Sequence, residues 1–225
     1  MYETLEDKVK ERTAEVIRQK EIIEEKNKDI TDSIQYAKKI QQAILPAENE
    51  IRKVLPNSFV YYSPKDIVSG DFYWYSQAGE WVTFAVADCT GHGVPGALMS
   101  AICNNLMNQI INDSNVISPA SALNELDDKL RKLLSQSSGG QQGANDGMDI
   151  ALCRLNVKTN QIIYAGAQRP LLIIRGEQLI ELKPNKHSIG GYKNEMKVFY
   201  RSYLTTSKRR FYIPLYRWLC RPIWR

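Results

Sequence analysis

Two aspartates beside glycines are the residues of this chain best suited to chemistry. Asp71 follows Gly70, and Asp88 opens a loop that contains Gly91 and Gly93. Glycine allows positive backbone φ and a close approach of the main chain to a ligand. Carboxylates that converge with main-chain carbonyls in such loops suit a hard divalent cation such as Mg²⁺ or Mn²⁺. The pattern therefore predicts a cation site, and the simpler alternative is that Asp88 caps a turn.

Other reactive side chains near this loop are weaker candidates. Cys89 has no neighbour in the loop sequence that would serve as a base toward its thiol. His92 could act as a general acid, although a structural role in the loop is the favoured interpretation. Asp149 has apolar neighbours typical of a core strand, so we do not expect it to bind the cation directly. We expect His187 at the surface.

A predicted hairpin places the two aspartates. Residues 71–75 and 81–88 are rich in aromatic and β-branched side chains, and a glycine-containing turn at 77–80 separates them. Residues 59–62 have the same strand-like composition. Asp71 and Asp88 are therefore expected at the ends of neighbouring strands.

Two helices are expected next. After Pro95, apolar residues recur at three-to-four spacing from Leu98 to Ile110, which predicts a helix to about Asn112 with this stripe in the core. Ser118-Pro119 supplies an N-cap and a proline at the first position of a second helix. Residues 135–147 are rich in Ser, Gln, Gly and Asn and predict a mobile loop.

Strand patterns resume after the helices, at residues 148–155, 161–165, 170–175 and 178–182. The chain thus has strands, then two helices, then a run of strands joined by tight turns. That order predicts an α+β fold with an antiparallel sheet, because an alternating parallel fold would intersperse helices between the strands.

The first 44 residues predict a long helix, since they are dense in Glu, Lys, Gln, Ile and Val and hold no glycine or proline. Pro46 ends this helix. A coiled coil has two apolar positions in each seven-residue repeat, and here polar residues interrupt the second of them. Two interpretations therefore stay open: a parallel dimeric stalk, or a single amphipathic surface helix. Apolar residues recur every seven positions, the period of a left-handed coiled coil, at Val9, Val16, Ile23, Ile30, Ala37 and Ile44.

Composition limits the class of protein. The length of 225 residues suits one domain, or one domain with an appendage, and 43% hydrophobic with 24% charged residues excludes collagen-like and wholly disordered chains. Four cysteines without a C-x-x-C pair predict neither a disulfide framework nor a zinc site and favour the reducing cytoplasm. We expect no membrane span and no signal peptide, because no apolar run approaches about 20 residues.

The longer sequence around the aspartates resembles the PPM-type metal-dependent protein serine/threonine phosphatases, and within them the bacterial SpoIIE-like branch. The resemblance is found in the sequence motifs at residues 69–74 and 87–97. Residues 146–152 and 164–171 are similar to the family's following strands. Residues 34–46 resemble the switch helix that links a sensor module to this branch.

The resemblance implies roles for individual residues. Asp88 would be the catalytic residue and would bridge two divalent cations, Mn²⁺ or Mg²⁺. The main-chain carbonyl of Cys89 would complete the second metal site, and Asp71 would hold that metal directly or through water. Two such ions activate a water and neutralise charge on phosphoryl oxygens. The loop that supports the metals would consist of Gly70, Gly91, His92 and Gly93.

The sequence departs from the family near its C-terminus. The family has two further acidic ligands, in a Thr-Asp-Gly turn and a late Asp-Asp pair, whereas no acidic residue follows Thr206 here. Residues 207–225 contain six basic residues, so the 30 basic residues of the chain fall to 24 against 25 acidic ones without them, a net charge of −1. Their aromatic, proline and arginine residues follow no helix or strand period.

We interpret this tail as the product of a frameshift, because reading permitted codons one nucleotide later allows an apolar strand followed by Thr-Asp-Gly. The chain would then be truncated within its domain, and we expect little or no phosphatase activity from it. The alternative is a genuine basic and aromatic tail for an anionic surface.

Together these patterns predict an α+β protein: an antiparallel β-sandwich flanked by helices, PPM phosphatase-like but incomplete, preceded by a long coiled-coil helix. We expect a signalling helix at 1–45, a linker at 46–57, a partial phosphatase domain at 58–206 and an aberrant tail at 207–225. The expected function is hydrolysis of phosphoserine or phosphothreonine on a regulatory protein. The alternative is a non-catalytic partner-binding module. Expected associations are a homodimer through the N-terminal helix and an upstream sensor module, with no nucleic acid.

Overall fold

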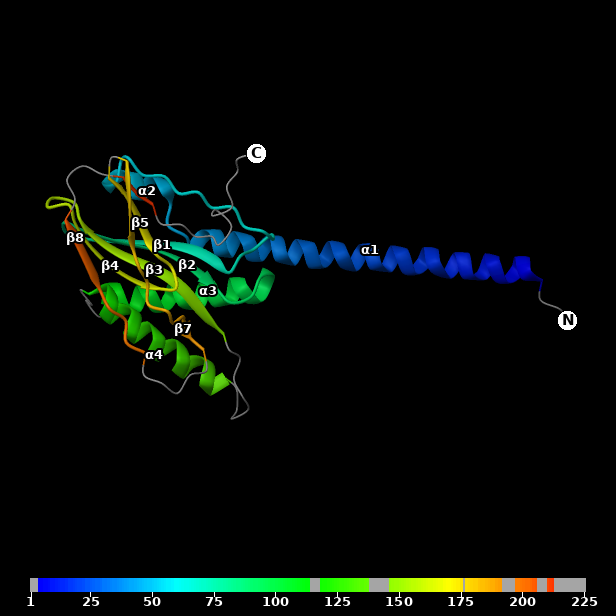
Figure 1. Cartoon of the computed structure of the whole chain (residues 1–225). Coiled ribbons are helices and arrows are strands. Elements are labelled where there is room, and N and C mark those ends of the chain that lie inside the picture. Colours follow the sequence, from blue (N-terminus) through cyan, green and yellow to red (C-terminus); the bar gives the residue numbers. More distant parts are fainter. Residues whose placement is uncertain are drawn as a thin grey trace.

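The computed structural model describes residues 4–113, 118–137, 146–175, 177–191, 197–205 and 210–212. Its longest element is the helix α1, Leu5–Ile44, which projects away from a body of strands and helices (Figure 1). Thr4 caps α1 because its hydroxyl accepts a hydrogen bond from the Asp7 N–H at 3.4 Å. The helix ends at Ile44, and its C-cap Leu45 lies directly before Pro46, as expected.

The remaining elements follow in chain order. They are α2 (Glu48–Val54), β1 (Asp71–Ala78), β2 (Trp81–Cys89), α3 (Gly93–Asn108), the π-helical turn η1 (Gln109–Asp113), α4 (Pro119–Ser137), β3 (Gly147–Asn156), β4 (Gln161–Ala167), β5 (Leu171–Arg175), β6 (Gln178–Leu182), β7 (Ile189–Gly190), β8 (Ser202–Thr205) and β9 (Arg210–Tyr212).

The strands form two antiparallel sheets. One has the order β1-β2-β3-β4-β8, with β7 pairing to β3, and the other has the order β6-β5-β9. Helices α3 and α4 lie along one face of the larger sheet, and β5 lies on its other side (Figure 1). The α+β architecture with helices flanking an antiparallel sandwich is therefore confirmed.

Each face of the larger sheet has its own apolar core, and β3 divides them because successive side chains of a strand point to opposite faces. Ile150 packs in the cluster that includes Leu126 of α4. Its neighbour Ala151 packs in the cluster that includes Leu171 and Ile173 of β5. The helices and the smaller sheet thus hold the central strands from both sides.

Several sequence expectations need correction. Residues 59–62 form no strand, although their composition is strand-like, and α2 lies within the stretch expected to be a linker. Helix α3 begins at Gly93, before Pro95. The apolar stripe of this helix predicts Leu98 in the core, but 62% of its surface is exposed.

The C-terminal tail and the loop before β3 are described in part. Residues 210–212 form β9 and pair with β5, so the tail contains a short strand that its composition does not predict. Residues 206–209 and 213–225 lie outside the described residues, as does most of the loop expected at 135–147. Among the described helices, none is both long and apolar enough to cross a bilayer.

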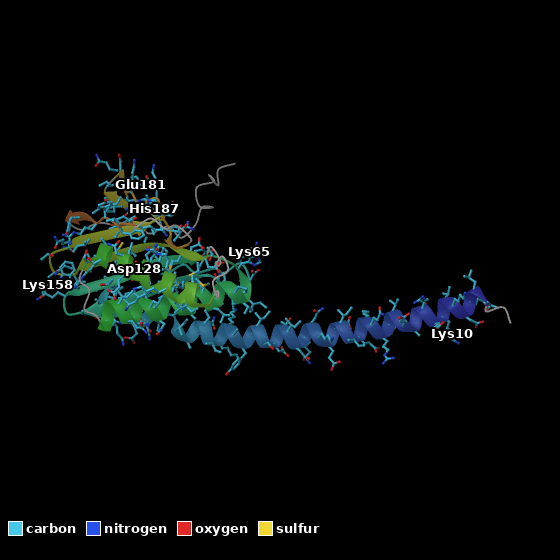
Figure 2. All side chains as sticks on the ribbon, turned by 90° about the horizontal axis from the view of Figure 1, so that it is seen from below. Lys10, Lys65, Asp128, Lys158, Glu181 and His187 are labelled. Atoms are coloured by element: carbon cyan, nitrogen blue, oxygen red, sulfur yellow. The ribbon has the colours of Figure 1, made fainter. Side chains whose placement is uncertain are left out.

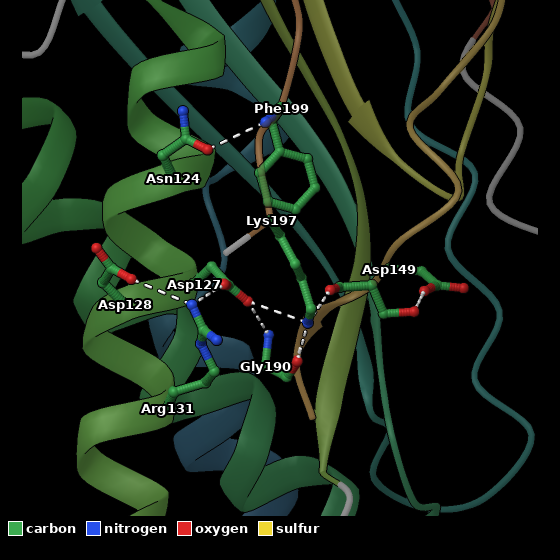
Figure 3. A network of polar contacts seen from close by, with 9 residues as sticks. Asn124, Asp127, Asp128, Arg131, Asp149, Gly190, Lys197 and Phe199 are labelled. Atoms are coloured by element: carbon green, nitrogen blue, oxygen red, sulfur yellow. Dashed lines mark hydrogen bonds and ion pairs between the residues drawn. The ribbon is translucent and has the colours of Figure 1, made fainter. Parts of the chain in front are cut away.

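A buried polar network ties α4 to the segment around β7 (Figure 3). The Asp127 side chain is 2% exposed, pairs with Arg131 at 2.6 Å and accepts a hydrogen bond from the Gly190 N–H at 2.7 Å. The Lys197 ammonium lies 3.3 Å from the same carboxylate and donates to the carbonyls of Ser188, at 2.9 Å, and Gly190. The carboxylate therefore holds a helix, a turn and a segment distant in sequence together.

Replacing Asp127 by alanine would leave the buried Lys197 without its carboxylate. We expect Asp127→Ala to lower the free energy of unfolding by about 3 kcal/mol, measured by urea denaturation. The control is Asp128→Ala, since the neighbouring side chain is 64% exposed; its effect should stay within about 0.5 kcal/mol. Equal losses in the two variants would show that the network does not stabilise the fold in this way.

Candidate functional site

Three aspartates lie side by side across three neighbouring strands, and we call them the acidic row. In the strand registers Asp71 of β1 stands opposite Asp88 of β2, and Asp88 stands opposite Asp149 of β3. Directly opposed residues of antiparallel strands have Cα atoms about 4.5–5.5 Å apart. The next residues, Phe72 and Ile150, belong to the core beneath the helices, so the acidic row faces the opposite side of the sheet.

Glycines let the loops at the ends of these strands pack against one another. A Cβ atom on Gly70 would lie 2.8 Å from the Cys89 carbonyl oxygen and 2.9 Å from that of Gly91. A Cβ atom on Gly96 would lie 2.6 Å from the Gly91 oxygen. Gly91 and Gly93 also have φ of 87° and 61°, which favours glycine at both positions. The predicted supporting loop is thus closely packed beside the acidic row.

A basic side chain joins two members of the acidic row. Arg169 follows β4; its guanidinium pairs with Asp88 and lies 3.6 Å from an Asp149 oxygen. Its side chain is 15% exposed, and its Nε is buried without a hydrogen-bond partner among the described residues. Asp149 also accepts a hydrogen bond from the Ser188 hydroxyl at 2.6 Å. Arg169 therefore supplies positive charge to an acidic cluster.

The electrostatics of the acidic row favour a further positive charge. The pKa of Asp88 is raised to about 6, first by burial and then by the charges of Asp71 and Asp149, while Arg169 opposes the rise. Like charges that cannot separate disfavour ionisation of all the carboxyls at once. A divalent cation would relieve this repulsion, so the residues at this end of the sheet fit a cation.

The described residues offer an incomplete ligand set for two such ions. Within those residues, no three His, Cys, Asp or Glu side chains gather closely enough to hold a metal. The side-chain donors suited to a hard cation are the carboxylates of Asp71 and Asp88. The main-chain carbonyl of Cys89 is near them by sequence, and its role as a ligand remains a prediction.

The other candidate side chains have surroundings that limit their chemistry. A hydrogen bond with Cys103, together with burial, raises the pKa of the Cys89 thiol well above its usual value, so this thiol is a poor nucleophile. His92 precedes the first residue of α3, and its Nδ1 lies 3.1 Å from Asp66 with 85% of the side chain exposed. His187 lies at the surface, as expected (Figure 2).

Sequence comparison identifies the family. Residues 78–202, more than half of the chain, match the sequence profile described as Stage II sporulation protein E (SpoIIE). The chain belongs to the SpoIIE family. Sequence matching to curated proteins found no similar one.

Solved phosphatase structures resemble this SpoIIE-family chain. The SiaA-PP2C domain of Pseudomonas aeruginosa is 31% identical, with a TM-score of 0.68 over 80% of this chain and 69% of that chain. A mutated bacterial serine phosphatase is 10% identical, with a TM-score of 0.50 over 63% of this chain and 66% of that chain. The PP2C domain of SpoIIE from Bacillus subtilis is 16% identical, with a TM-score of 0.49 over 62% of this chain and 39% of that chain.

Sequence reasoning missed two residues that the structure places beside Asp88 in the candidate site. The apolar neighbours of Asp149 favour a core strand, but period two places its side chain on the face opposite to theirs, directly beside Asp88. Arg169 gives no signal of its own, because it lies 81 residues from its partner Asp88. The alternation within 148–155 is the signal that could identify Asp149.

The raised pKa of Asp88 predicts a pH dependence of stability. The folded chain binds this proton more tightly than the unfolded chain, whose aspartates have a pKa of about 3.9. The resulting stabilisation is complete below about pH 4 and is lost as pH rises through about 6. Without divalent cations, we expect the free energy of unfolding to fall by about 1 kcal/mol more in the parent than in Asp88→Asn over this range, after allowance for solvent screening. A difference that is constant with pH would contradict this assignment.

Proposed function

We propose that this SpoIIE-family chain carries the framework of a metal-dependent protein serine/threonine phosphatase, acting on a phosphorylated regulatory protein. The observation that supports the proposal most strongly is the row of Asp71, Asp88 and Asp149 on adjacent strands, with an elevated Asp88 pKa that a cation would lower. We place the protein in the cytoplasm, in keeping with buried free thiols at Cys89 and Cys103.

In this proposal the chain's own residues hold and orient the reacting groups. Asp88 and Asp71, with the Cys89 carbonyl, would hold two divalent cations, Mn²⁺ or Mg²⁺. When bound, such ions supply an activated water and neutralise charge on phosphoryl oxygens. Arg169 fixes Asp149 and Asp88 relative to each other, and the glycine loops keep both strand ends in register.

A second candidate is a partner-binding module without turnover. Two observations favour it: the described residues contain no three-ligand cluster, and the guanidinium of Arg169 already pairs with Asp88. Such a module would dock its partner on the same fold without holding the two cations.

Calorimetric titration with Mn²⁺ separates the two candidates. Two tight sites that are lost in Asp88→Asn would support the phosphatase framework, and no binding would support the module. Lys158→Met is a matched control, because Lys158 pairs with Glu80 beyond the opposite ends of β1 and β2. Its titration should be the same as that of the parent.

The incomplete ligand set of the described residues predicts impaired catalysis. We expect this chain to release phosphate from a phosphoserine peptide in Mn²⁺ no faster than Asp88→Asn does. If residues 207–225 arise from a frameshift, the product of a gene shifted by one nucleotide after codon 206 should contain an apolar strand and Thr-Asp-Gly, and it should gain Mn²⁺-dependent release by roughly 100-fold or more, as expected of restored metal catalysis. Fast release by the unshifted chain, abolished by Asp88→Asn, would overturn the prediction of impairment.

We also propose that α1 forms a parallel dimer and transmits a signal from an upstream sensor module. The seam residues Val9, Val16, Ile23 and Ile30 are 57%, 62%, 57% and 58% exposed in the single chain. The outer part of α1 stands clear of the body, with its side chains directed outward all around (Figure 2). A second helix would bury this apolar stripe.

Charge placed in the seam should prevent this association. We expect the parent to sediment as a dimer and Ile23→Lys to shift the equilibrium toward monomer by at least roughly tenfold, because a lysine cannot be buried unpaired without a large cost. The control Glu21→Lys lies on the outer side of the heptad and should remain dimeric. A parent that is monomeric at micromolar concentrations would contradict the dimer.

A further inference from the structure

A single buried polar residue anchors the long helix to the body. Helix α1 is described along its whole length and buries one residue, Gln41, which is 6% exposed. Gln42, its neighbour, is exposed. A buried amide that lacked partners would be costly, so the contacts of Gln41 indicate what the helix is built to hold.

The Gln41 amide has partners for both its nitrogen and its oxygen. Its Nε2 donates to the Ser69 carbonyl at 2.6 Å and to the Ser100 hydroxyl at 2.9 Å. Its Oε1 accepts a hydrogen bond from the Ser69 N–H at 3.1 Å. An amide side chain suits a residue whose N–H and C=O are both to be bonded, because a carboxylate only accepts and an ammonium only donates.

The residue bonded to Gln41 is close to a candidate metal ligand. The Ser69 hydroxyl accepts a hydrogen bond from the Asp71 N–H at 3.0 Å. The Gln41 amide binds Ser69, and Ser69 binds Asp71, so two successive links join α1 to the first residue of β1.

A second connection fastens the chain just after α1 to the same strand. The Tyr73 hydroxyl donates to the Pro46 carbonyl at 3.1 Å. The Tyr62 hydroxyl also donates a hydrogen bond to the Asp71 carbonyl, at 3.1 Å. The end of α1 and the segment that follows it are therefore held to the start of β1 at two points.

Close packing extends this anchorage to Asp88. Gly70 leaves no room for a Cβ between its Cα and the carbonyls of Cys89 and Gly91. The Cys89 N–H donates to the Gly70 carbonyl at 3.3 Å. A displacement of Ser69 must therefore move the loop that follows Asp88 as well, because interiors packed this tightly transmit strain.

We propose that Gln41 is a positioning residue, which makes the geometry of the Asp71–Asp88 site depend on how α1 is seated. The expected effect of Gln41 on metal binding rests on the proposed function. Its expected effect on the loop after Asp88 rests on the hydrogen bonds alone. Successive residues of a helix are about 100° apart around its axis, so a change in the register of α1 takes the amide away from Ser69. The site then loses the contact that fixes its first strand.

Two variants and a control test this role. Gln41→Leu removes all three hydrogen bonds, and Gln41→Glu keeps the shape but loses the donor to the Ser69 carbonyl. Gln42→Leu is the matched control, because it changes the same residue type at an exposed neighbouring position. Amide hydrogen exchange is the direct readout, since the Ser69 N–H is itself bonded to Gln41.

We expect exchange in residues 69–72 to accelerate by roughly tenfold or more in both Gln41 variants, with residues 150–155 of β3 unchanged. In the same two variants, the amide chemical shifts of residues 88–91 should change, and Mn²⁺ affinity should fall by roughly tenfold. The Gln42→Leu control should match the parent within about twofold in every measurement.

The role of Gln41 would be overturned by unchanged exchange at 69–72, by equal acceleration in β3, or by local acceleration with unaltered chemical shifts at 88–91. Retained Mn²⁺ affinity in a variant with accelerated exchange would also overturn it. A parent that binds no Mn²⁺ would instead count against the proposed function, and the exchange and chemical-shift results would still decide the role of Gln41.

Discussion

Carboxylates gathered at one end of a sheet must be compensated by positive charge, and much of the site follows from this constraint. The strand registers place Asp71, Asp88 and Asp149 in one row, and burial makes their mutual repulsion more costly. Arg169 offsets part of that repulsion in the isolated chain. The remaining imbalance is expressed in the raised pKa of Asp88, which a cation held beside it would lower.

Several elements support the strands and loops that carry the acidic row. The core beneath α3 and α4 supports one face of β1, β2 and β3, and the smaller sheet packs against the other face of β3. Gly70 and Gly96 allow the loops to approach each other closely. Gln41 connects this unit to α1, so the outer helix and the acidic row share one framework.

Features that depend on local pattern could be predicted from the sequence. The hairpin that carries the first two aspartates, both core helices and the strands that follow them can be inferred from periodicity and turn residues. The roles of Asp149 and Arg169 depend on strand register and on a contact between distant segments, which periodicity does not encode. Gln41 escapes such reasoning because an amide in a polar helix looks like a surface residue. Residues 59–62 show that strand-like composition also needs a partner strand.

Because α1 is long and is anchored near one end, a tilt of the helix displaces its outer end much more than its anchored end. From Leu5 to Gln41 the helix spans about 54 Å at 1.5 Å per residue. A tilt of about 5° about Gln41 would carry the outer end through about 5 Å while moving Ser69 by a small fraction of that distance. Conversely, a modest force applied far from the body acts on Ser69 through a long lever arm. With Gln41 as a positioning residue, a helix of this length would convert large movements of its outer end into fine adjustments at the acidic row.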